Sequence, residues 1–103
     1  MTTRRAKARW TTTILVCRKC SKKVKGGFGP DGKTPLAKAL RKHLQIGKGR
    51  KAAAGILEVG CLDLCPKEAV TLVDARHPGQ WLVVRPGANL DTLAHELGLK
   101  ELH

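Results

Sequence analysis

Four short runs of aliphatic and β-branched residues stand out along the chain as candidate β-strands. They cover residues 11–16, 56–59, 70–73 and 81–84, and polar or glycine-rich sequence separates them. Runs of about four to eight such residues are typical of strands buried in a sheet. The last two runs are separated by His77-Pro78-Gly79-Gln80, whose turn-forming residues predict an antiparallel hairpin.

Two helices are predicted by apolar residues that recur at helical spacing. Between Pro35 and Gly47, leucines repeat every four residues while lysine and arginine fall on the opposite face. A second helix is expected to begin at its N-cap, Asn89, and to stop at Gly98. Residues 18–33 are polar and rich in glycine, and so predict a long loop. The apolar stripes of the two helices are Leu36, Leu40 and Leu44, and Leu90, Leu93, Ala94 and Leu97.

The predicted order of elements, β-α-β-β-β-α, places the chain in the α/β class. Because a strand, a helix and a second strand follow one another, the first two strands should be parallel neighbours. The hairpin adds antiparallel strands, so the four-stranded sheet should be mixed. A chain of 103 residues has room for one domain, which we place at residues 11–103, behind a basic, flexible arm formed by residues 1–10.

The net charge of +12 is concentrated in the first half of the chain. Residues 1–51 hold 16 of the 20 lysines and arginines, but only one of the eight acidic residues, Asp31. Such asymmetry indicates a basic face or arm that would attract an acidic protein or nucleic acid. Nucleic acid is the less favoured partner, because aromatic residues make up 3% of the chain and there is no tyrosine to stack on bases.

The apolar runs are also too short to direct the chain to a membrane. None approaches the length of a membrane-spanning helix, and the N-terminus shows no hydrophobic signal segment. We therefore expect no membrane partner and a cytoplasmic location. Cysteines in that reducing compartment persist as thiols or bind metals, and seldom form structural disulfides.

Four cysteines form two closely spaced pairs, each directly after a predicted strand: Cys17-x-x-Cys20 and Cys61-x-x-x-Cys65. The carboxyl ends of neighbouring parallel strands lie at one edge of a sheet, so the two pairs can converge there. Four thiolates at one point are a soft-metal site, suited to zinc or to an iron–sulfur cluster. The cations near the first pair, which are also candidates for partner docking, are Arg18, Lys19, Lys22, Lys23 and Lys25.

Other interpretations of the cysteines are two disulfides, four unrelated buried thiols, or a redox dithiol at Cys17 and Cys20. A dithiol would need its first cysteine at the N-terminus of a helix. The following residues, 21–25, run into two glycines and are a poor helix former. A dithiol would also leave Cys61 and Cys65 unexplained.

The second cysteine segment resembles that of the thioredoxin-like [2Fe–2S] ferredoxins. The similar run is Val59-Gly60-Cys61-Leu62-Asp63-Leu64-Cys65-Pro66-Lys67-Glu68-Ala69-Val70-Thr71-Leu72, and Ile14-Leu15-Val16-Cys17 resembles the family's first segment. The order of strands and helices is also similar. The resemblance implies a thioredoxin-like fold with two helices and a [2Fe–2S] cluster held by four cysteines near the surface. It implies electron transfer or cluster carriage without catalysis, often as a homodimer, and the basic half would then dock an acidic redox partner.

The first cysteine pair departs from the family's pattern. In better-known members the first two cysteines are farther apart, and the second would fall near residues 26–30, where this chain has no cysteine. Cys20 is then the fourth ligand, on a loop of different shape. Zinc accepts the same four thiolates, so the alternative function is a zinc-stabilised basic module that binds nucleic acid or an acidic protein.

Residues 27–34 match GxxxxGK(S/T), the pattern of a phosphate-binding P-loop. A P-loop begins directly after a strand, whereas ten residues separate Val16 from Gly27. Pro35 also removes an N–H group from the start of the helix that follows. We therefore expect a flexible loop beside the metal site and no nucleotide hydrolysis.

Overall fold

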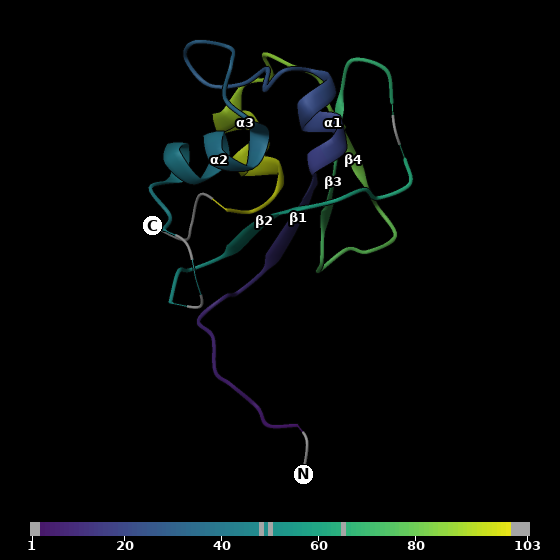
Figure 1. Cartoon of the computed structure of the whole chain (residues 1–103). Coiled ribbons are helices and arrows are strands. Elements are labelled where there is room, and N and C mark those ends of the chain that lie inside the picture. The colour runs from purple at the N-terminus through teal and green to yellow at the C-terminus, as the bar shows by residue number, and fades with distance from the viewer. Residues whose placement is uncertain (1–2, 48, 50, 65, 100–103) are drawn as a thin grey trace.

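A four-stranded sheet and three helices make up the structure, a computed structural model that describes residues 3–47, 49, 51–64 and 66–99 (Figure 1). The elements follow in the chain as β1 (Thr13–Cys17), α1 (Arg18–Lys23), α2 (Leu36–Leu44), β2 (Gly55–Val59), β3 (Val70–Asp74), β4 (Leu82–Val84) and α3 (Leu90–Glu96). The predicted α/β class, the four strands and the two longer helices are confirmed. Among the described residues, no helix has the length and apolar character needed to cross a membrane.

β1 lies in the interior of the sheet, whose strand order is β2-β1-β3-β4. It pairs in parallel with β2, with Leu15 opposite Leu57, and antiparallel with β3, with Leu15 opposite Val73. β3 and β4 form the predicted antiparallel hairpin. The sheet is thus mixed, as the sequence predicts, and helix α2 lies in the crossover between its two parallel strands. The carboxyl ends of β1 and β2 therefore lie at the same edge.

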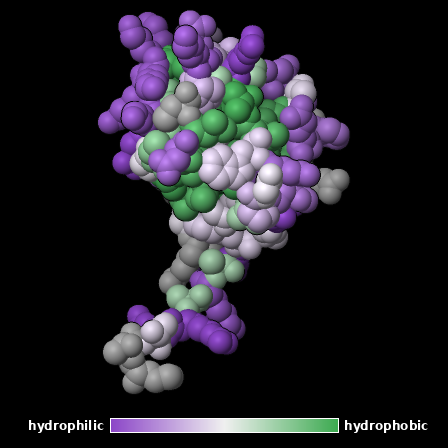
Figure 2. Space-filling model, turned by 90° about the vertical axis from the view of Figure 1, so that its right-hand side faces the viewer, coloured by the Kyte–Doolittle hydropathy of each residue, from purple (hydrophilic) through white to green (hydrophobic). Residues whose placement is uncertain are grey.

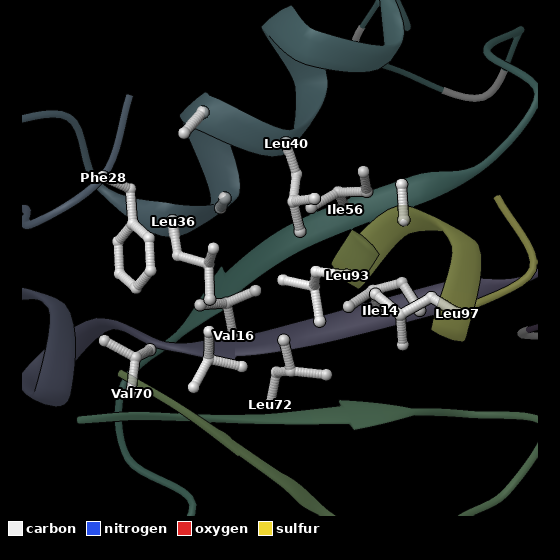
Figure 3. Close-up of a cluster of buried hydrophobic side chains, with 14 of the residues drawn as sticks. Ile14, Val16, Phe28, Leu36, Leu40, Ile56, Val70, Leu72, Leu93 and Leu97 are labelled. Carbon is white, nitrogen blue, oxygen red and sulfur yellow. The ribbon is translucent and has the colours of Figure 1, made fainter. Parts of the chain in front are cut away.

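α2 and α3 both pack on one face of the sheet and enclose the core. Alternate residues of a strand point to opposite faces, so Ile14 and Val16 of β1 face the helices while Leu15 faces away. Leu57 and Val83, on the face turned away from these helices, remain 40% and 50% exposed. Figure 3 shows the side chains that meet between the layers, namely Leu36, Leu40, Leu93 and Leu97 from the helices and Ile14, Val16, Ile56, Val70 and Leu72 from the strands.

Helix α1 lies inside residues 18–33, so the prediction of a continuous loop there was wrong. Cys17 caps the helix, because its Sγ accepts a hydrogen bond from the N–H of Cys20 at 3.4 Å. The hydroxyl of Ser21 donates to the Cys17 carbonyl at 3.0 Å. The chain turns away after the helix at Gly26, whose N–H donates a hydrogen bond to the Ser21 carbonyl. The φ of Gly26 is +86°, a left-handed conformation that favours glycine. The glycines that predict a loop therefore begin only after the helix has ended.

Phe28 joins the glycine-rich loop after α1 to the core. Its side chain is 1% exposed, and its backbone pairs with that of Thr34 through hydrogen bonds of 2.9 and 3.0 Å. Asp31 Oδ1 accepts hydrogen bonds from the Lys33 N–H at 2.9 Å and from the Thr34 hydroxyl at 3.3 Å. These donors, which a P-loop would direct at phosphate, are thus bonded to a carboxylate. The loop also follows a helix instead of a strand.

The chain before β1 runs beside the segment that leads into β2. Trp10 Nε1 donates a hydrogen bond to the Gly49 carbonyl at 2.8 Å. The indole ring lies so close to Gly55 that a Cβ at that glycine would clash with it. At the free edge of β2, the Arg41 guanidinium donates a hydrogen bond to the Ile56 carbonyl. Arg41 thereby covers an acceptor that the edge strand would otherwise offer to another chain.

Candidate metal centre

Helix α1 brings the first cysteine pair together. Cys17 is the last residue of β1 and is fully buried, and Cys20 lies in the first turn of the helix at 1% exposure. Because the Cys20 N–H points to the Cys17 sulfur, the two residues face each other across one helical turn. The helix therefore supplies a local reason for the two-residue spacing of the pair.

The loop after β2 carries Cys61 to the same edge of the sheet. The parallel register places Cys17 opposite Val59, two residues before Cys61. The N–H of Lys19 donates to the Gly60 carbonyl at 3.2 Å and ties the loop to α1. The structure thus shows the expected approach of the second cysteine segment to the first pair.

The carbonyl of Leu64 is a second link between the two segments. It accepts a hydrogen bond from the Cys20 Sγ at 3.8 Å and another from the Thr71 hydroxyl at 3.0 Å. Thr71 is fully buried in β3, so its hydroxyl is a fixed donor that orients the Leu64 carbonyl. Sequence analysis missed this role, although a hydroxyl within an aliphatic strand is a usable signal. Cys65, the next residue and a predicted ligand, lies outside the described residues.

Asp63 turns the chain so that a backbone donor points to Cys61. Its φ of +63° is left-handed, a conformation that aspartate tolerates better than most residues. Its N–H lies 3.3 Å from the Cys61 Sγ. Cys61 itself is exposed, unlike the first pair. The loop therefore presents one sulfur near the surface.

Hydrogen bonds favour the thiolate form of Cys17. Burial alone would raise the pKa of this thiol, but the donors around the sulfur outweigh burial and hold the pKa below its usual value. Cys20 contributes through both its backbone and its side chain, followed by the backbone N–H groups of Leu62 and Lys19. Leu62 belongs to the second cysteine segment, so that segment helps to stabilise charge on the first. Backbone donors leave no signature in a sequence, and sequence analysis missed these.

The donor chemistry at this edge suits a soft metal. Within residues 3–47, 49, 51–64 and 66–99, no three His, Cys, Asp or Glu side chains are grouped closely enough to hold a metal ion. Cys17 and Cys20 form a sulfur pair, Cys61 lies on the adjoining loop, and the fourth predicted ligand is outside these ranges. Thiolate sulfurs that accept N–H hydrogen bonds are typical of zinc and iron–sulfur sites.

The predicted docking cations surround the first cysteine pair. All are exposed. Arg18 lies 3.9 Å from Glu58 of β2 in a partly exposed ion pair. The cations lie on α1 or directly after it, and are Arg18, Lys19, Lys22, Lys23 and Lys25.

A hollow of about 770 Å³ lies apart from the cysteines, between the loop at residues 29–34, α2 and α3. Its lining includes Asp31 and Asp91 as well as Lys42 and His43. His43 Nε2 lies 3.5 Å from Asp91 Oδ1. The lining therefore carries groups of both signs, with two carboxylates and one lysine, and it contains no cysteine.

No family model, curated protein or solved structure matches this chain. The function therefore has to be inferred from the donor atoms at the sheet edge and from the charges around them. Both point to the cysteine segments as the chemically distinctive part of the molecule.

Proposed function

We propose that the protein holds a [2Fe–2S] cluster through Cys17, Cys20, Cys61 and Cys65, and that it carries electrons or the cluster itself. The observation that supports this best is the parallel pairing of β1 and β2, which brings the two cysteine segments to one sheet edge. When bound, such a cluster supplies one-electron redox chemistry. The protein makes and breaks no substrate bonds in this role, and so is not an enzyme.

The residues around the first pair would adjust the properties of the site. N–H groups that bond to Cys17, together with the cations of α1, offset negative charge on the thiolates. Such donors and charges raise the reduction potential of an iron–sulfur site. The same cations would attract an acidic redox partner. A cytoplasmic location is part of the proposal, because ligation of the cluster requires cysteines that are not joined in disulfides.

A redox dithiol and a zinc site are the competing functions. Helix α1 begins directly after its N-cap, Cys17, so the sequence argument that a poor helix follows the first cysteine was wrong. Burial still opposes a dithiol, because both Cys17 and Cys20 are at most 1% exposed and a disulfide on another protein cannot reach them in this conformation. Zinc would use the same thiolates, and metal analysis separates it from iron.

The test is the absorption spectrum of anaerobically purified protein, with iron, zinc and acid-labile sulfide measured on the same sample. We expect visible absorption and equal amounts of iron and sulfide. Cys20→Ser and Cys61→Ser should abolish the absorption. Ser21→Ala is the matched control, because it alters a buried neighbour of Cys20 without removing a sulfur.

Circular dichroism of each variant shows whether the fold is kept. Zinc without sulfide or colour would replace the cluster by the zinc-stabilised binding module. Full colour in Cys20→Ser would remove Cys20 from the ligand set and reject the assignment of the first pair.

A further inference from the structure

The face of the sheet turned away from α2 and α3 carries an apolar row that crosses the strands. Leu15 of β1 lies opposite Leu57 of β2 on one side and opposite Val73 of β3 on the other, so all three project from this face. One step along, Val83 of β4 lies opposite Thr71. We call Leu15, Leu57, Val73, Val83 and the nearby Trp81 the open face.

The open face is accessible at its two edges, whereas Val73 in its middle is 7% exposed. Leu57 and Trp81 are each 40% exposed, and Val83 is 50% exposed. The Trp81 ring is held by a hydrogen bond from its Nε1 to the Pro78 carbonyl at 2.8 Å. Figure 2 shows apolar surface gathered on the side of the molecule opposite α2 and α3, bordered by hydrophilic side chains. A contiguous apolar patch with a polar rim is typical of a protein-binding surface.

The rim of this surface is positive where it meets the candidate metal centre. α1 stands at the carboxyl end of β1 (Figure 1). Its exposed side chains include Lys19, Lys22 and Lys23. Nearby acidic residues are fewer: Glu58 is paired with Arg18, and Asp63 and Glu68 lie on the loop between β2 and β3. The apolar row and the cations lie on consecutive elements, because Leu15 belongs to β1 and α1 follows β1 directly.

We propose that the open face and the exposed cations of α1 together form the docking surface for a protein partner with an acidic rim and an apolar centre. The proposal deepens the function given above, since it takes that partner to be the one that exchanges electrons or the cluster. Charge complementarity selects this occupant: a second copy would bring its own net charge of +12 and the same row of cations. Nucleic acid would satisfy the lysines but would leave the aliphatic row uncovered.

The probe is a synthetic helical peptide with leucines on one face and glutamates on the other. It is titrated into ¹⁵N-labelled protein as isolated, at about 0.15 M salt, while amide chemical shifts are followed. Two matched peptides replace the glutamates by glutamines or the leucines by serines. We expect saturable shifts at Leu15, Leu57 and Val83 with the acidic amphipathic peptide, and weaker binding by both matched peptides.

Variants of the protein separate charge from apolar contact. Lys19→Glu with Lys23→Glu should weaken binding about tenfold or more. Lys38→Glu with Lys42→Glu on α2 changes the net charge equally and should weaken binding less than about twofold, because α2 packs on the opposite face of the sheet. Val83→Thr keeps the shape of the side chain but should weaken binding about fivefold. Val83→Ile should bind as well as the unmodified protein.

The proposal is overturned if the peptide fails to bind at millimolar concentration, if shifts fall outside the open face and α1, or if the α2 variant weakens binding as much as the α1 variant. Tighter binding of a DNA oligonucleotide at the same amides, or self-association through them, also overturns it. Iron, sulfide and zinc are measured on the same samples. Peptide binding at the open face in a protein that contains no iron would support the docking surface and reject the cluster. Iron and sulfide in a protein that does not bind the peptide would support the cluster and reject the docking surface.

Discussion

Asp74→Asn removes a buried negative charge that joins three parts of the fold. Asp74 is 5% exposed at the end of β3, and its carboxylate accepts a hydrogen bond from the Thr12 hydroxyl at 2.8 Å. It also accepts from the Arg76 backbone N–H at 3.0 Å and from Arg76 Nη2 at 3.1 Å. Arg76 in turn donates to the Leu97 carbonyl after α3. The substitution therefore weakens the hydrogen bonds that connect the end of β3 to the residue before β1 and, through Arg76, to the end of α3.

The expected loss of stability follows from the bonds that asparagine can keep. A hydrogen bond to a charged group contributes about 1.5–3 kcal/mol. The amide oxygen of asparagine can still accept from Thr12 and from the Arg76 backbone, but its NH₂ group cannot accept from Arg76 Nη2. The Arg76 side chain is 43% exposed and can turn toward water, which limits the loss. We expect a decrease of about 2–3 kcal/mol in the free energy of unfolding, or about 10–20 °C in Tm.

The difference between the two proteins should depend on pH. Burial would raise the pKa of the Asp74 carboxyl, but hydrogen bonds from Arg76 and Thr12 outweigh burial and hold the pKa below its ordinary value of 3.8. A carboxyl with a lowered folded pKa contributes stability above its unfolded pKa and loses it as the pH falls through the folded pKa. The cost of Asp74→Asn should therefore be full at neutral pH and shrink below about pH 4.

Urea unfolding followed by far-UV circular dichroism measures this at several pH values, with chelator and reductant in every sample. Thr12→Val is the matched control. It removes one donor to the carboxylate and should cost about 1.5 kcal/mol, the lower end of the range for such a bond, because the Arg76 donors remain and the carboxylate still titrates. A cost for Asp74→Asn that is smaller than that of Thr12→Val, or that stays constant into acid, would refute the argument.

Four further substitutions test the packing of loops and helix ends by the same unfolding assay. Phe28→Ala should cost about 3–5 kcal/mol, because this ring is 1% exposed; a cost below 1 kcal/mol would mean that the loop is not packed on the core. Gly26→Ala should cost at least about 2 kcal/mol, because its φ is +86° and a Cβ would clash with the Lys33 carbonyl. Gly32→Ala, with a φ of +67° but open space, should cost about 1 kcal/mol, and equal costs would contradict the clash. Asn89→Ala removes the N-cap of α3 and should cost about 1 kcal/mol; no change would mean that the cap contributes nothing.

The strands and the longer helices could be predicted because local pattern and tertiary burial agree there. The leucines of α2 that repeat along the sequence are the ones buried against the sheet, and β3 is buried along its whole length. Helix α1 could not be predicted in the same way. It has six residues, too few for a periodic pattern, and a cysteine sulfur caps it. Its first turn is held by the bond from Lys19 to Gly60, a contact 41 residues distant in the chain.

The candidate site was predictable as far as topology determines it. The expectation that two cysteine segments meet at one edge needs only parallel strands, and the pairing of β1 with β2 provides them. The hydrogen bonds at Cys17 and the role of Thr71 depend on where the loop after β2 folds back, which spacing does not encode. The burial of Cys20 likewise follows from α1, the element that sequence analysis missed.

The central position of β1 has a consequence for the order of events during synthesis. Both neighbours of β1 in the sheet come later in the chain, so Cys17 and Cys20 leave the ribosome before β2 does and before it can pair with β1. Cys61 follows 44 residues after Cys17, which at typical rates of translation is a delay of roughly 2–9 s. During that time the first two thiols are accessible to any oxidant and can be joined to each other. We therefore expect the share of folded chains whose Cys17 and Cys20 are both thiols to rise when reductant is present during translation.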